Sequence, residues 1–128
     1  MGNLSSSPPS DPQRATVYLV PWNFLTRIPM TADDVRKSAW VTAQVRRDRH
    51  LLTTLATWLA VTEFQGPSPH PFGNPRVVID IEVADGTMAS YYANRNQLHE
   101  VASGRTRGID QTTFGNHLAS LLFFDHAG

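Results

Sequence analysis

The clearest pattern of hydrophobic and polar positions lies between residues 76 and 94. Apolar residues occupy every second position before Asp85-Gly86, and a second β-rich run begins at Thr87; the alternating residues are Val77, Ile79, Ile81 and Val83. Alternation at period two, interrupted by Asp-Gly, is the strongest short-range signal of a β-hairpin. The pattern therefore predicts two antiparallel strands that are joined at Asp85-Gly86.

A two-residue turn at Asp85-Gly86 predicts which residues face each other across the hairpin. It pairs Ile79 with Tyr92 and Asp80 with Tyr91, because successive side chains of a strand alternate between its two faces. One face is then apolar and belongs to the core. The other face presents Asp80, Glu82 and Tyr91 to solvent.

Four shorter runs predict further strands, at residues 16–20, 39–45, 98–101 and 105–109. The second run is ambiguous, because no Gly or Pro occurs between Thr31 and Phe64 and one long helix is an alternative. We favour a strand there, since Trp40, Val41 and Val45 are better strand residues than helix residues.

Three helices are predicted from capping residues and apolar stripes. Thr31 caps a helix that ends near Ser38, and Asp48 caps a second helix with apolar residues at three-to-four spacing. Asp110 caps the last helix, whose inner stripe is Phe114, Leu118, Leu121 and Leu122. Strands joined by tight turns are antiparallel. The order predicts an α+β fold, with an antiparallel sheet of about five strands and three helices packed mainly on one face.

The chain of 128 residues suits one domain. Residues 1–15 are predicted to be a flexible Ser/Pro-rich tail, and residues 16–128 a single α+β domain. The start Met1-Gly2 fits a myristoylation pattern, so Gly2 is a candidate for lipidation. The default expectation is a cytoplasmic protein, and a processed N-terminus would make it lipid-tethered or periplasmic.

Composition argues against several classes of function. The formal net charge is zero, whereas nucleic-acid binders usually carry a basic excess. The densest basic cluster, residues 46–50, contains Asp48 and is typical of a solvated turn, although a phosphate contact there is an alternative. No apolar run approaches the roughly 20 residues of a transmembrane helix.

No pattern for a metal or a cofactor is present. There is no cysteine, the five histidines form no HxH, HxxxH or HExxH spacing, and no Gly-rich phosphate loop occurs. We therefore expect no metal site and no cofactor. The sequence does not decide whether the protein is an enzyme, and we favour a non-enzymatic protein.

Two places are candidate binding sites. Asp80 and Glu82 lie on one predicted sheet face, where they would form an acid pair for hydrolysis with His99, or would contact a basic partner together with Tyr91. Residues 65–75 form a proline-rich loop, in which His70 and Phe72 are candidate anchors.

The favoured function is a small protein-binding module, such as an enzyme inhibitor or a toxin-neutralising immunity protein. Its partner is another protein, which the sequence does not identify. One alternative is a small hydrolase or ligand-binding protein that uses the acidic sheet face. The other is an N-terminally lipidated adaptor at a membrane.

Overall fold

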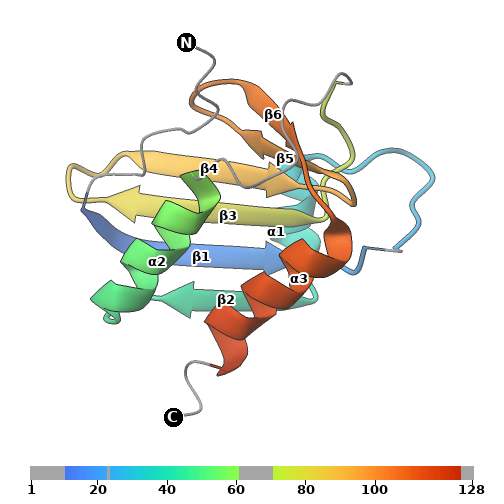
Figure 1. Cartoon of the computed structure of the whole chain (residues 1–128). Coiled ribbons are helices and arrows are strands. Elements are labelled where there is room, and N and C mark those ends of the chain that lie inside the picture. The colour runs from blue at the N-terminus through green and yellow to red at the C-terminus, as the bar shows by residue number, and fades with distance from the viewer. Residues whose placement is uncertain (1–10, 23, 61–70, 125–128) are drawn as a thin grey trace.

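The computed structural model describes residues 11–22, 24–60 and 71–124 (Figure 1). The elements in chain order are β1 (Pro12–Leu19), α1 (Ala32–Ser38), β2 (Val41–Val45), α2 (Arg49–Ala60), β3 (Val77–Val83), β4 (Met88–Ala93), β5 (Gln97–Glu100), β6 (Arg105–Gly108) and α3 (Gln111–Ala119). A π-helical turn, η1 (Ser120–Phe124), continues α3.

The strands form one antiparallel sheet in the order β2-β1-β3-β4-β5-β6. The α+β class is confirmed, with six strands where about five were expected. The strand expected at residues 39–45 is also confirmed, as β2. β1 begins at Pro12 and buries Ala15 completely, so residues 12–15 belong to this strand, although the sequence placed them in the tail.

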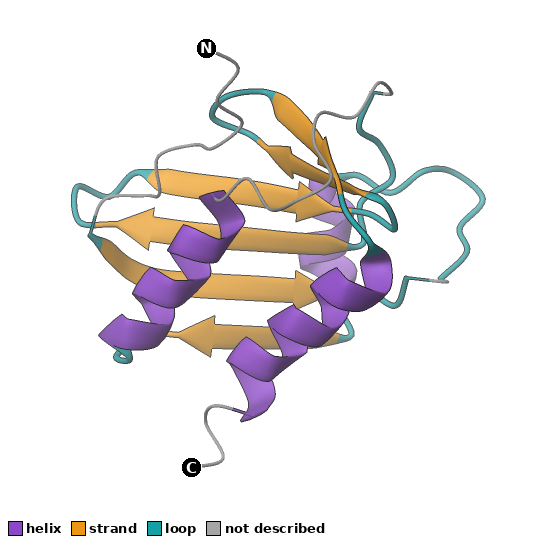
Figure 2. Ribbon diagram, viewed as in Figure 1, coloured by secondary structure: helices purple, strands orange, loops and turns teal. Residues whose placement is uncertain are grey.

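Helices cover both faces of the sheet, two on one side and one on the other (Figure 2). The larger hydrophobic cluster contains buried residues of α2, α3 and the sheet, among them Leu55, Ile79 and Phe114. A smaller cluster forms where α1 meets the opposite face and consists of Val20, Met30, Val35 and Val78. The expectation that the helices pack mainly on one face thus holds for α2 and α3.

All three predicted caps are confirmed. Thr31 and Asp34 form a capping box, in which each side chain accepts a hydrogen bond from the other's backbone N–H. Asp48 Oδ1 accepts from Leu51 N at 2.9 Å, and Asp110 Oδ2 accepts from Thr113 N at 2.9 Å. These bonds satisfy N–H groups that the first turn of a helix leaves without partners.

The predicted hairpin is present, but its predicted register is wrong by one residue. Gly86 N donates to Val83 O at 2.9 Å and Val83 N donates to Thr87 O at 3.0 Å, so the loop holds three residues rather than two. Gly86 has a φ of +88°, as the last residue of such a loop requires. The actual pairs include Ile79 with Tyr91 and Asp80 with Ser90.

The shift moves the two tyrosines to the faces opposite to those predicted. Tyr91 is only 2% exposed and belongs to the larger core cluster, whereas Tyr92 packs against the smaller cluster under α1. The reason is geometric, since a slip of one residue turns every side chain of a strand to the other face.

Candidate functional site

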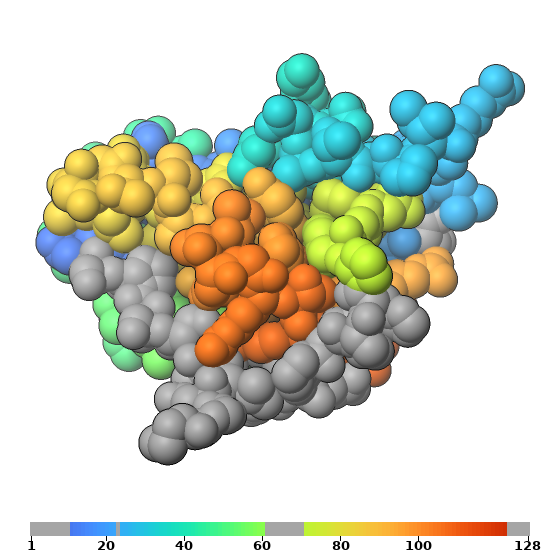
Figure 3. Space-filling model, turned by 90° about the horizontal axis from the view of Figure 1, so that it is seen from above, coloured from blue at the N-terminus to red at the C-terminus, as the bar shows by residue number. Residues whose placement is uncertain are grey.

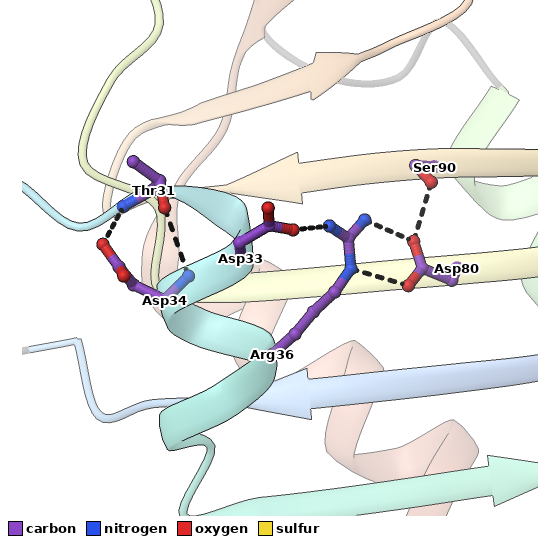
Figure 4. A network of polar contacts seen from close by, with 6 residues as sticks. All are labelled: Thr31, Asp33, Asp34, Arg36, Asp80 and Ser90. Carbon is purple, nitrogen blue, oxygen red and sulfur yellow. Dashed lines mark hydrogen bonds and ion pairs between the residues drawn. The ribbon is translucent and has the colours of Figure 1, made fainter.

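Asp80 was predicted to face solvent, and this is wrong. Its carboxylate accepts two hydrogen bonds from Arg36, Nε to Oδ2 and Nη2 to Oδ1, both at 2.9 Å (Figure 4). Ser90 Oγ donates to Oδ1 at 2.7 Å, and Asp80 as a whole is 9% exposed. The cause is α1, which lies over this part of the sheet and carries Arg36.

Arg36 holds α1 to the sheet. Its Nη1 also pairs with Asp33 Oδ1 at 2.9 Å, and its Cζ lies 5.7 Å from the centre of the Tyr92 ring. The carboxylate of Asp80 raises the pKa of Arg36, which keeps the guanidinium group charged. The two-point geometry is the strongest form of a guanidinium–carboxylate contact. Asp80 is therefore a structural anchor.

Glu82 lies on the same face as Asp80, as predicted, and it is also paired. Its Oε1 lies 2.7 Å from Arg14 Nη2, and the two side chains are 34% and 41% exposed. Each acid of the predicted catalytic pair therefore has its own arginine. A catalytic acid pair would need carboxyl groups that are free to contact a substrate, whereas each of these carboxylates is engaged by a guanidinium group.

Tyr91, predicted as an interface residue, lies in the core. Burial, together with the nearby charge of Glu100, raises its pKa to about 12. Arg107 lies close by, is 2% exposed, and donates from Nη2 to Leu59 O at 2.7 Å. Arg107 thus joins the end of α2 to the sheet, and the buried Tyr91 and Arg107 offer no surface to a partner.

Phe72 is one of the two anchors that were predicted for the loop site, and it packs against two aromatic rings of the sheet. Its ring centre lies 5.3 Å from that of His99 and 6.3 Å from that of Tyr92. His99 Nδ1 lies 2.9 Å from Thr106 Oγ1, and burial lowers the pKa of His99. Phe72 is half-buried, so part of it remains open to a partner. His70 and Gly2 lie outside the described residues.

The sequence analysis predicted the strand β2 but did not place it at the edge of the sheet. No described strand pairs with its outer side, and its five residues, VTAQV, include neither a charge nor a proline. Natural proteins usually protect such an edge with one of those devices. Trp40, directly before β2, is 65% exposed, and Val41 is 44% exposed.

An apolar groove of about 270 Å³ opens beside the start of β2. It lies between α3 and the ends of β1 and β2; its lining is Leu19, Val20, Pro21, Trp22, Trp40, Val41, Val77, Gly115, Leu118 and Ala119. Every side chain in this lining is apolar, apart from the indole N–H groups. The groove is large enough for one or two apolar side chains.

The far end of β2 is basic. Arg46 and Arg47 follow the strand, both are exposed, and neither makes an ion pair with another described residue. Asp48, which the sequence suggested would neutralise them, is used as the cap of α2. The edge thus runs from an apolar groove to two arginines.

No group of three or more potential ligands that could hold a metal ion occurs in the part of the chain that is described. The helices of that part are too short or too polar to cross a membrane. In comparisons with known proteins, no family model, curated protein or solved structure matches the chain.

Proposed function

We propose that the protein is a non-enzymatic protein-binding module whose β2 edge receives an extended segment of its partner. The uncharged, exposed edge strand beside the Trp40 groove carries this proposal. An inhibitor or an immunity protein is the specific form that we favour, because its task needs a binding surface and no catalytic group.

Strand addition uses the backbone of the edge. A five-residue edge spans about 17 Å and offers N–H and C=O groups that a partner strand satisfies. Alternate side chains of that strand then enter pockets, which provides specificity. Trp40 suits this role, since exposed aromatic residues beside a groove commonly carry a large share of binding energy.

The difference between the apolar start and the basic end of β2 sets the direction of the partner segment. An apolar side chain would occupy the groove near Trp40, and acidic side chains would lie near Arg46 and Arg47. A segment that lay in the reverse direction would place its acidic side chains in the apolar groove, where desolvation of a charge is costly. The proposed partner segment is therefore apolar at one end and acidic at the other.

Site-specific photo-crosslinking tests this proposal. A benzophenone amino acid is introduced at Val41, or at the exposed Thr53 of α2 as a control, and the full chain is expressed in its native host. We expect a crosslinked protein only from position 41. Equal crosslinking from both positions would contradict strand addition at β2.

Affinity for the captured protein provides the second measurement. Trp40→Ala should weaken binding about 30-fold, the equivalent of about 2 kcal/mol. The matched control is Met88→Ala, because Met88 is 50% exposed and lies at the start of β4, away from β2 in the sheet. It should leave affinity unchanged. Both variants should keep the melting temperature within a few degrees, since both side chains are largely exposed.

The two alternative functions remain untested proposals. A hydrolase would need groups other than the paired Asp80 and Glu82. An adaptor tethered through Gly2 would depend on a segment outside the described residues, and mass spectrometry of the native protein would detect the acyl chain.

A further inference from the structure

A second cavity, of about 330 Å³, lies among three loops and shares Trp22 with the lining of the apolar groove. Its lining is Trp22, Phe24, Leu25, Gly73, Asn74, Arg76, Asn94, Arg95 and Asn96. Two of these loops, coloured light blue and yellow-green, lie side by side in Figure 3. The lining includes two arginines and three asparagines, and none of its described residues is acidic.

Arg76 is buried, with 5% of its surface exposed, and its charge has no anionic partner among the described residues. The guanidinium donates only to neutral acceptors. These are Phe24 O at 2.7 and 3.1 Å, Asn74 Oδ1 at 2.8 Å, Pro75 O at 3.0 Å and Asn74 O at 3.4 Å. A buried charge is normally paired, because leaving water without a counter-charge is costly.

The charge of Arg95 adds to this imbalance. Burial lowers the pKa of Arg76, and the nearby positive charge of Arg95 lowers it further, whereas no acid acts in the opposite direction. Arg95 is exposed and makes no ion pair with another described residue. The cavity therefore has a positive electrostatic potential.

Several N–H donors around the cavity have no acceptor among the described residues. Nη2 of Arg76 has two hydrogens and one acceptor, Phe24 O. Asn74 uses its Oδ1 to accept from Met30 N at 2.9 Å and from Arg76, which leaves its amide nitrogen available. Asn74 has a φ of +56°, a left-handed conformation that Asn tolerates and that these bonds hold in place. The donors are thus fixed before any ligand arrives.

From this geometry we propose that the cavity binds a small organic anion. The carboxylate or phosphate group of the ligand lies among Arg76, Arg95 and the free amide of Asn74. Its planar or apolar part packs against Trp22, Phe24 and Leu25. This site is separate from the β2 edge, and the inference does not depend on the proposed function.

Nuclear magnetic resonance titration tests the site with three probes of similar shape. Benzoate and phenyl phosphate are anions, and benzamide is the neutral control. At least one anion should shift the indole N–H signal of Trp22 and the side-chain amide signals of Asn74 in a saturable way, with a dissociation constant of about 1 mM for probes of this size. Benzamide should produce no saturable shift.

Two charge variants complete the test. Arg95→Gln should weaken binding of the anion about tenfold, because it removes one of the two positive charges near the ligand. Arg27→Gln is the matched control, since Arg27 is an exposed arginine of the same loop region and does not line the cavity. It should change the affinity less than twofold. A melting curve confirms that both variants are folded.

Three results would overturn the inference. They are the absence of saturable shifts with both anions, binding of benzamide as strong as that of the anions, and equal weakening by Arg95→Gln and Arg27→Gln. The last result would mean that the anions respond to overall charge and do not occupy a defined site.

Discussion

Replacing Arg36 by Met tests whether its ion pair with Asp80 anchors α1 to the sheet. Breaking a fully buried pair costs about 3–5 kcal/mol, because the remaining charge is buried without a partner. Here the side chains of Arg36 and Asp80 are 28% and 11% exposed, so water partly compensates the remaining carboxylate. We therefore expect Arg36→Met to lower the free energy of unfolding by about 2–3 kcal/mol.

Urea denaturation, followed by the fluorescence of the three tryptophans, measures this change. Arg14→Met is the matched control, because Arg14 pairs with Glu82 on the same sheet face but both partners are more exposed. Surface pairs contribute about 0–1 kcal/mol. The control should therefore cost much less than Arg36→Met.

The double variant Arg36→Met, Asp80→Asn separates the ion pair from other effects. This double variant leaves no uncompensated charge. Its loss in free energy of unfolding should therefore be smaller, by about 1–3 kcal/mol, than the sum of the losses of the two single variants. Equal losses for Arg36→Met and Arg14→Met, together with no coupling to Asp80, would refute the assignment of Asp80 as an anchor.

Three further predictions concern the hairpin turn, the core tyrosine and the stacked histidine. Gly86→Val should lower the free energy of unfolding by about 1–3 kcal/mol, because Gly86 has a φ of +88°. Gly86→Asn should cost less than half as much, since Asn tolerates this conformation, and an unchanged urea midpoint for the Val variant would contradict the loop geometry. The pKa of Tyr91 is about 12, so ultraviolet titration should show one of the three tyrosines ionising near that pH. Because this value exceeds the unfolded value of about 10, the contribution of Tyr91 to the free energy of unfolding should be fully present below pH 10 and be lost between pH 10 and 12. Tyr91→Phe should remove this loss. The pKa of His99 is lowered by burial, so the contribution of His99 to the free energy of unfolding should be fully present above the unfolded value of about 6.5 and be lost at lower pH. His99→Gln should flatten this fall, and an unchanged slope in that variant would assign the effect to other groups.

Local sequence signals determined where each helix begins and where β2 lies, although not where β1 begins. Thr31, Asp48 and Asp110 were recognisable as caps because the N–H group that each accepts from lies three residues away in the chain. The stripe from Phe114 to Leu122 was recognisable because helical periodicity alone places these side chains on one face. The β2 strand followed from the preference of Trp40, Val41 and Val45 for extended backbone.

The register of the hairpin was decided by the tertiary structure. Asp85-Gly86 fits a two-residue turn, and it fits equally well the end of a three-residue loop in which Gly86 has a positive φ. The choice depends on which alternative buries the better set of side chains on the α2–α3 face. Burial of Tyr91 beside Glu100 and Arg107 belongs to that set, and no local pattern around residue 86 contains this information.

Long-range contacts also decided which polar groups are available at the surface. Asp80 is neutralised by Arg36, which lies 44 residues away, so only the path of α1 across the sheet determines its burial. The exposed position of β2 depends on β1 pairing with both β2 and β3, which leaves β2 at the edge. Arg76 reads as an ordinary basic residue before a strand, and only the folding of residues 24 and 74 around its guanidinium buries its charge. The sequence thus determined the elements through contacts of a few residues, whereas both candidate surfaces arise from chain segments that only the folded sheet brings together.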